Sequence, residues 1–235
     1  MHGERIDVLD HGFVRLVDHM GNDLSIVRAA RVSYDAAWRA GENDGSDHRL
    51  IQFLWKNHHT TPFEAVEFQF EVKAPIFVIR QWHRHRTWTF NELSGRYREL
   101  DELYYVPDPK HIGSQSLDNK QGRVIDESEH AGLALRLDDT SRLRSHHAKS
   151  FEIYRDLIAD GWPRELARSV LPVATYSHMF AKVDLHNLFH FLSLRCHSHA
   201  QYEIRVYADA MLRLIEPIVP VAVGAWRKEF EAAHA

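Results

Sequence analysis

The chain has 235 residues, of which 44% are hydrophobic and 26% are charged. This composition excludes a disordered or fibrous protein and predicts one globular domain over residues 1–235. The net charge is −4 with neutral histidines, which argues against a nucleic-acid-binding protein because such proteins are usually basic, so any anion site must be local.

Residues 1–57 predict two helices. The N-terminus, Met1 to Asp7, is polar, and no stretch reaches the roughly 20 apolar residues of a membrane span, so we expect no leader, no membrane contact and a cytoplasmic protein. Residues 21–25, Gly-Asn-Asp-Leu-Ser, predict the cap of a helix over 26–32, because Asn and Asp accept hydrogen bonds from the free N–H groups of a first turn. A second helix is expected over 46–57.

A strand and a third helix follow. Residues 66–73 read Val-Glu-Phe-Gln-Phe-Glu-Val-Lys, an alternation that places Val66, Phe68, Phe70 and Val72 on one face of a strand. Pro75 suits the first turn of a helix over 76–83. This helix leads into a cluster of arginines, and a strand followed by such a helix is a suitable frame for an active site.

The stretch 80–98 inverts the charge balance of the chain. Its cations are Arg80, Arg84, Arg86, Arg96 and Arg98, with His83 and His85 among them, against the single carboxylate of Glu92. On a helix, Gln81 and Arg84 lie three residues apart and Arg80 and Arg84 four apart, so these side chains can share one face. A solitary surface arginine is usually solvated or paired with a carboxylate. Here the nearby carboxylates are too few to neutralise the arginines, so the cluster predicts a bound phosphate or pyrophosphate.

The run 91–97, Asn-Glu-Leu-Ser-Gly-Arg-Tyr, carries a second group of polar side chains. If this run is extended, Glu92, Ser94 and Arg96 project to the same side, because side chains alternate along a strand. Ser94 and Arg96 together can hold a phosphate, and Glu92 can accept hydrogen bonds from ribose hydroxyls or a base N–H. Ser94 is alternatively a nucleophile, but that role needs a positioned base, and no nucleophile-elbow sequence surrounds this serine.

The second half of the chain predicts mostly helices. Residues 107–128 are rich in Asp, Gly, Ser, Asn and Pro and predict a surface excursion, either a mobile lid or a plain loop. Helices are expected over 145–160 and 163–170, then an extended segment over 173–184 and a helix over 185–194. A long last helix carries Ile204, Ala208, Met211 and Ile215 at helical spacing. This order of elements predicts an α+β fold with helices packed around a small β-sheet.

Two isolated arginines and the single cysteine add further candidates. Arg168 stands four residues after Arg164 on a predicted helix, and Arg195 ends an apolar helix, where the helix dipole alone already favours a cation. Cys196 adjoins Arg195, and a nearby cation lowers the pKa of a thiol, so Cys196 is a candidate nucleophile. A lone cysteine also excludes a disulfide within the chain, which agrees with a reducing compartment.

Other signatures are weak or absent. No glycine-rich dinucleotide loop or Walker loop occurs, so a dinucleotide would be held by arginines and histidines instead. His197, His199 and Glu203 could suggest a metal site, although their spacing is not diagnostic and such residues more often make ordinary hydrogen bonds. We predict no metal.

Taken together, the motifs resemble those of flavin-dependent thymidylate synthases. Arg84-His-Arg86, followed after seven residues by Ser94, is similar to the signature of that family. The resemblance covers nearly the whole chain, through residues 21–25, 31–33, 61–64, 74–82, 163–168, 194–195 and 198–201. It implies the α+β fold of the thymidylate synthase-complementing proteins, a homotetramer with sites shared between subunits, and no nucleic-acid partner.

The resemblance also implies an activity and a set of site residues. The reaction would be the reductive methylation of dUMP to dTMP, with methylenetetrahydrofolate as carbon donor and NADPH as reductant through FAD, for the synthesis of dTTP. The residues implied for dUMP are Gln81, Trp82, His83, Arg84, Glu92, Leu93, Ser94, Gly95, Arg96, Arg168 and Arg195. Those implied for FAD are Ser33, His59, Thr61, Glu64, Arg84, His85, Arg86, Glu92, Asp184, His186 and His190. We also hypothesise that His59 helps to place the folate.

Three positions depart from the family pattern. Where the family commonly has Asn-x-Arg, with Asn four residues after that Arg, this sequence has Asp184-Leu-His186 and His190. The two histidines keep the spacing of four and could still offer donors, whereas an ionised Asp184 cannot donate as an asparagine amide does. The resemblance assigns catalysis to Arg195, which would stabilise the anion formed when uracil loses its N3 proton, with no covalent adduct to Cys196.

Two rival functions predict different behaviour. A nucleic-acid-binding module built on residues 80–98 would bind polynucleotides with a steep salt dependence and would be colourless. A histidine-based metal hydrolase would contain stoichiometric metal and lose activity with chelators. Only a flavoenzyme would be yellow and bleach with NADPH in the absence of oxygen.

Overall fold

The computed structural model describes residues 3–125 and 130–233 and consists of one antiparallel sheet with helices around it. The sheet order is β1-β2-β3-β7-β4. The strands span β1 (Arg5–Val8), β2 (Gly12–Met20), β3 (Glu67–Pro75), β7 (Tyr176–Asp184) and β4 (Thr89–Glu92). All neighbouring strands are antiparallel. The α+β prediction is therefore confirmed.

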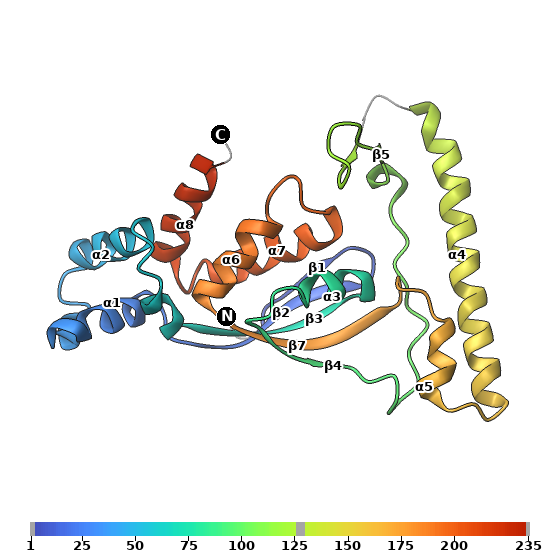
Figure 1. Ribbon diagram of the computed structural model, residues 1–235, viewed down its shortest axis with the longest axis horizontal. Helices are drawn as coiled ribbons and strands as arrows, with labels where there is room; N and C mark the ends of the chain where they lie inside the picture. The colour runs from blue at the N-terminus through green and yellow to red at the C-terminus, as the bar shows by residue number, and fades with distance from the viewer. Residues whose placement is uncertain (1–2, 126–129, 234–235) are drawn as a thin grey trace.

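One face of the sheet holds the main hydrophobic core. The predicted alternation in β3 is confirmed, because Val66, Phe68, Phe70 and Val72 are all fully buried. Helices α3 (Ile76–Trp82), α6 (Leu185–Arg195) and α7 (Tyr202–Ile215) lie on this side of the sheet, as Figure 1 shows. The predicted apolar stripe of α7 is buried along its whole length. The opposite face is polar, with Glu71 accepting from Arg15 and lying 2.7 Å from the His178 ring nitrogen.

At one end of the molecule three helices pack together. Helix α1 (Asp23–Arg31) begins with the predicted cap, since the Asn22 side chain accepts from the Leu24 N–H. Helix α2 (Asp44–Lys56) matches the predicted second helix and begins two residues earlier, at the Asn43 cap. Helix α8 (Pro220–Ala233) has no counterpart in the sequence prediction, and its first N–H groups donate to Asp23 at 2.9 and 3.0 Å.

The other end of the molecule is dominated by one long helix (Figure 1). Helix α4 spans His130–Ala159, so the predicted start at residue 145 is wrong by half the length of the helix. Its first half is polar but rich in Leu, Ala and Arg, and these residues sustain a helix without an apolar stripe. Helix α5 (Arg164–Ala167) and the 3-10 helix η5 (Arg168–Val170) complete this end, with a second small core around Phe151.

Shorter elements connect these parts. The 3-10 helices η1 (Val32–Tyr34), η2 (Ala37–Arg39) and η3 (Thr61–Ala65) join α1, α2 and β3. The excursion after residue 107 contains η4 (Pro109–His111) and a hairpin of β5 (Ser114–Gln115) and β6 (Arg123–Val124), and its predicted end at 126–128 lies outside the described residues. No helix in the described ranges is both long and apolar enough to cross a membrane.

Candidate functional site

A basic pocket lies between the end of α3 and the outer face of α6. Its volume is about 680 Å³, and its lining is Arg84, His85, Arg86, Thr87, His186, Asn187, His190, Leu194 and Arg195. Three arginines and three histidines thus line the pocket, and no carboxylate is among the lining residues. The structure therefore brings Arg84, His85 and Arg86 to Arg195, which follows them by more than 100 positions. His186 and His190, which precede Arg195 on α6, line the same pocket.

The centre of this pocket is a contact between Arg195 and His85. The Arg195 Nε–H donates to His85 Nε2 at 3.1 Å, so this ring nitrogen must be an unprotonated acceptor. Burial, Arg195 and His190 lower the pKa of His85 to about 4, and the imidazole is neutral at pH 7. Arg195 is partly buried, its pKa is lowered by burial, and its only side-chain partner in the described structure is this neutral ring.

This arrangement leaves positive charge without an internal counter-ion. Among the residues that the structure describes, neither Arg84 nor Arg86 makes an ion pair or side-chain hydrogen bond, and both are exposed at the pocket. A buried or crowded cation is normally matched by an anion or an electron-rich group. The residues of the pocket therefore fit a ligand that is anionic or rich in acceptors.

The position of these residues follows from the end of α3. The helix ends at Trp82 with His83 as its cap, and the His85 N–H then donates to the Trp82 carbonyl at 2.9 Å in a turn. Arg84 consequently lies beyond the helix, and the predicted shared helix face with Gln81 and Arg80 is wrong. The indole of Trp82 is fully buried and stacks on Phe191 at 5.0 Å, so a ligand could meet only the Trp82 backbone.

A second group of predicted residues surrounds the end of β4. The strand stops at Glu92, which accepts from the Ser177 hydroxyl at 2.6 Å and lies 3.9 Å from the His83 ring. Leu93 continues along β7, with its N–H donating to the His178 carbonyl at 2.8 Å. After this residue the chain leaves the sheet.

The run 91–97 is extended only as far as Leu93, so the condition for a shared strand face of Glu92, Ser94 and Arg96 is not met. A turn follows Ser94, because the Tyr97 N–H donates to the Ser94 carbonyl at 3.1 Å, and the Ser94 hydroxyl accepts from the Arg96 N–H at 3.3 Å. Ser94 and Arg96 are therefore brought together by a turn, which the alternation of a strand would not require. Gly95 is buried, and a Cβ there would lie 3.2 Å from Arg168 Cδ, so Arg168 packs directly against this turn.

The turn and Arg168 form a small cationic cradle. The Arg96 guanidinium donates to Glu165 at 3.1 Å, an exposed pair that a stronger anion can displace. Arg168 is exposed and has no side-chain polar partner in the described parts of the chain. Arg168 thus packs against the turn that carries Ser94 and Arg96, and Glu165 is a neighbour of Arg96 that the sequence did not reveal.

A third group of predicted residues lies on and around the 3-10 helices η1 and η3. Ser33 on η1 and His59, Thr61 and Glu64 around η3 are all exposed. Figure 1 shows that α1, which leads into η1, and α5, which leads into Arg168, stand at opposite ends of the longest axis. The structure therefore does not bring Ser33 and Arg168 together within one chain.

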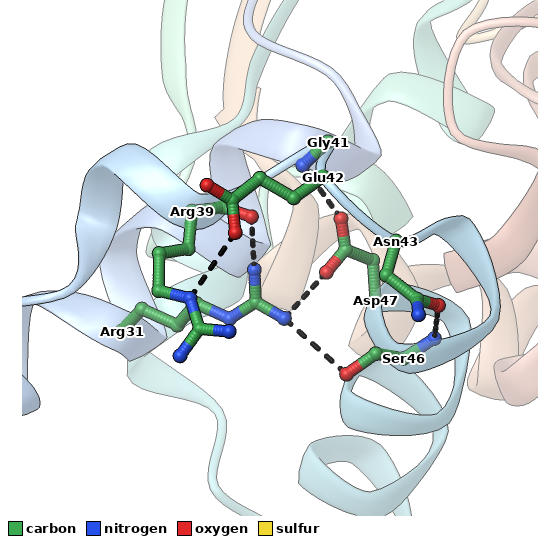
Figure 2. A network of polar contacts seen from close by, with 7 residues as sticks. All are labelled: Arg31, Arg39, Gly41, Glu42, Asn43, Ser46 and Asp47. Atoms are coloured by element: carbon green, nitrogen blue, oxygen red, sulfur yellow. Dashed lines mark hydrogen bonds and ion pairs between the residues drawn. The ribbon is translucent and has the colours of Figure 1, made fainter.

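The segment that carries Ser33 is held by a buried ion pair (Figure 2). The carboxylate of Asp47, 1% exposed, lies 2.5 Å from the Arg31 guanidinium and accepts from the Gly41 N–H at 2.7 Å. The same guanidinium donates to the Arg39 carbonyl at 2.6 Å. These bonds fix the course of residues 32–43 across the end of α1.

The three positions that depart from the family pattern have different roles at α6: two line the pocket and one caps the helix. His186 and His190 line the pocket, one turn apart. Asp184 instead caps the helix, accepting from the Asn187 N–H at 2.9 Å and from its side-chain amide at 2.6 Å. Asn187 itself lines the pocket and was missed, although its spacing of three from His190 places both on one helix face.

The structure also bears on the two remaining alternatives, a nucleophilic Cys196 and a metal site at Glu203. Burial and Asp209 raise the pKa of the Cys196 thiol, so this cysteine is poorly suited to act as a thiolate nucleophile. Glu203 already accepts hydrogen bonds from Tyr105, Arg123 and Gln201. The described residues contain no group of three or more side chains arranged to hold a metal ion.

Comparisons with known proteins show what this chain is similar to. Residues 15–221 match a family model described as "Thymidylate synthase complementing protein". A flavin-dependent thymidylate synthase of Ruegeria pomeroyi is 47% identical over 227 residues, which cover 93% of this chain and 72% of the relative. One of Thermus thermophilus is 47% identical over 226 residues, covering 95% and 78%. A crystal structure of a UMP/dUMP methylase, PolB from Streptomyces cacaoi, bound with 5-Br dUMP, has a TM-score of 0.84 at 37% identity and covers 95% and 97% of the two chains.

Proposed function

Because this chain belongs to the thymidylate synthase complementing protein family, we propose that it is a flavin-dependent thymidylate synthase that converts dUMP to dTMP. The observation that supports this proposal most directly is the partly buried Arg195, which is bonded to a neutral His85 and has no carboxylate partner among the described residues. In its finer form, the proposal is that the flavin is FAD, the carbon donor is methylenetetrahydrofolate and the reductant is NADPH.

The basic pocket supplies groups for the flavin. Arg84 and Arg86 can balance a pyrophosphate, and His186, Asn187 and His190 offer ring and amide donors along α6. When bound, the flavin would carry electrons from NADPH to the carbon received from the folate. His85 cannot take up a proton near neutral pH, so its task is to orient Arg195 through the bond at 3.1 Å.

The remaining groups fit dUMP. Arg96, Ser94 and Arg168 would hold the 5′-phosphate in the cradle at residues 94–96, and Glu92 would accept from the ribose or the base. Arg195 would stabilise the negative charge that uracil acquires when N3 loses its proton and C5 becomes nucleophilic. An opposite charge in contact moves a pKa by about 1 to 3 units, or roughly 1.4 to 4 kcal/mol, which is enough to make this anion accessible at neutral pH.

We also propose that each complete site is built from several copies of the chain, as in a homotetramer. The support is the separation of Ser33 from Arg168 along the longest axis (Figure 1). Two inactive variants, Arg195→Met and Arg168→Met, provide a test. If one chain donates Arg195 and another Arg168, mixing the two after mild dissociation should restore activity to some of the sites, whereas a site made by one chain would stay inactive.

The function itself is tested by a reconstitution assay. The purified protein should be yellow and should form dTMP from dUMP only when FAD, NADPH and methylenetetrahydrofolate are all supplied. Formation of dTMP without flavin, or a colourless protein that binds polynucleotides with a steep salt dependence, would overturn the proposal.

A further inference from the structure

A buried carboxylate stands at the start of α7, beside the candidate site. Glu203 is 2% exposed. Its Oε1 accepts from the Tyr105 hydroxyl at 3.1 Å and from the Arg123 guanidinium at 3.0 Å, and its Oε2 accepts from the Gln201 amide nitrogen at 2.9 Å. Burial and Glu203 raise the pKa of Tyr105, so this phenol remains a donor. Both oxygens of Glu203 therefore act as acceptors.

This carboxylate fixes the orientation of the Gln201 amide, and through it the orientation of the Gln81 amide. An ionised carboxylate only accepts hydrogen bonds, so Gln201 must direct its NH₂ group toward Glu203 and its carbonyl oxygen away. That carbonyl oxygen accepts from the NH₂ group of Gln81. Gln81 in turn is left with its own carbonyl oxygen, which has no partner among the described residues.

The free carbonyl oxygen of Gln81 lies on the helix that leads into the basic pocket. Gln81 is three residues before Arg84 and Gln201 is six residues after Arg195, so their bond ties together the two segments that supply the arginines of the pocket. A lone amide can rotate and present either its donor or its acceptor end. Here the chain of hydrogen bonds from Glu203 fixes the direction of the Gln81 amide, with its NH₂ group toward Gln201 and its carbonyl oxygen pointing away.

We propose that Gln201 and Glu203 are positioning residues for dUMP binding, which hold the Gln81 amide so that its carbonyl oxygen accepts an N–H or O–H group of the nucleotide. This inference rests on the proposed function, in which Gln81 contacts dUMP. Arg123 belongs to the same network. It lies on β6, its guanidinium donates to the Glu203 carboxylate and so ties the hairpin of β5 and β6 to α7, and it lies over the Tyr202 ring at 5.5 Å from the ring centroid.

A purely structural role would look different. If Glu203 served only to anchor Arg123 and Tyr105 to α7, its loss would lower thermal stability, and the affinity for dUMP would change independently of Gln81. If Glu203 acts through Gln201 and Gln81, the contribution of Gln201 to dUMP affinity should disappear once Gln81 is gone. A double-mutant cycle separates the two cases, because only coupled residues give non-additive effects.

The experiment uses the flavin-loaded protein and four variants, Gln81→Ala, Gln201→Met, Glu203→Gln and the double variant Gln81→Ala with Gln201→Met. The dissociation constant of dUMP is measured from the change that it causes in the flavin absorption spectrum, and KM and kcat from dTMP formation. Gln201→Met retains the length of the side chain on an exposed loop, so it remains informative even if the buried Glu203→Gln fails to fold. Gln121→Met is the matched control, because this exposed side chain makes no hydrogen bond of its own in the described structure.

We expect Gln81→Ala and Gln201→Met each to weaken dUMP binding about five- to tenfold, with flavin content and kcat little changed. The double variant should be no weaker than Gln81→Ala alone, and Gln121→Met should match the wild type. The inference would be overturned if the two single losses in dUMP affinity multiplied in the double variant, or if Gln81→Ala or Gln201→Met left the dUMP affinity unchanged. A wild-type protein that forms no dTMP at all would refute the proposed function itself.

Discussion

Replacing Arg195 by methionine tests the chemical core of the site. The change removes the guanidinium and keeps most of the apolar side chain, so the packing at the end of α6 is largely preserved. In the structure this cation is partly buried, donates to a neutral ring at 3.1 Å and has no carboxylate to neutralise it within the described ranges. Its charge is therefore available to an anionic pyrimidine in the pocket.

The expected size of the effect follows from this geometry. A contacting opposite charge is worth about 1.4 to 4 kcal/mol to the anion that it stabilises, which corresponds to a loss of roughly 10- to 1,000-fold in kcat/KM for dUMP. The assay is dTMP formation under saturating folate and NADPH, together with anaerobic reduction of the bound flavin by NADPH. The flavin of the variant should still be reduced, because that step does not involve the pyrimidine.

The matched control is Arg142→Met on α4, an exposed arginine paired with Asp139 at 3.3 Å. It should form dTMP at the wild-type rate. If Arg195→Met keeps kcat/KM within about twofold of the wild type while binding a normal amount of flavin, the charge of Arg195 does not act on the pyrimidine and the mechanism is wrong.

Three further predictions concern His85, Asp47 and Cys196. The folded-state pKa of His85 is about 4 against an ordinary 6.5, so its contribution to stability is complete above pH 6.5 and is lost as the pH falls from 6.5 to 4, by about 3 kcal/mol. Urea unfolding of the flavin-free protein should show this loss in the wild type and less of it in His85→Phe; equal pH profiles would contradict the shift. Asp47→Asn breaks a buried ion pair and should cost about 3 kcal/mol in the same assay and lower flavin content, unlike the exposed control Asp44→Asn. Cys196→Ala should retain dTMP formation within about twofold, because burial raises the pKa of this thiol; an inactive variant with normal flavin content would restore the cysteine as a nucleophile.

Local signals predicted much of the fold. The cap at Asn22 and the alternation of β3 depend on neighbouring residues, and both are confirmed. The start of α4 was misplaced because its first half lacks the apolar stripe by which a helix is recognised in sequence. Helix α8 was missed, and its first turn is capped by Asp23, about 200 positions earlier in the chain.

The site shows the same division between local and distant information. The arginines of residues 80–98 stand out because few acids lie near them, and this signal identified Arg84 and Arg96, whereas the role of Arg195 came from the family resemblance. Their partners could not be identified in the same way, since Glu165 pairs with Arg96 across 69 residues and Gln201 bonds with Gln81 across 120. The role of Asp184 as a cap was available locally, because an Asp directly before an apolar helix is a typical N-cap. The assignments to individual ligands remain predictions.

The two edges of the sheet restrict how copies of this protein can associate. The outermost strands, β1 and β4, are only four residues long, and they carry charged side chains at Arg5, Asp7 and Glu92. Short, charged edges discourage another polypeptide from adding a strand. Copies of this chain are therefore expected to associate through helices, loops or the open sheet face, and not through the pairing of edge strands.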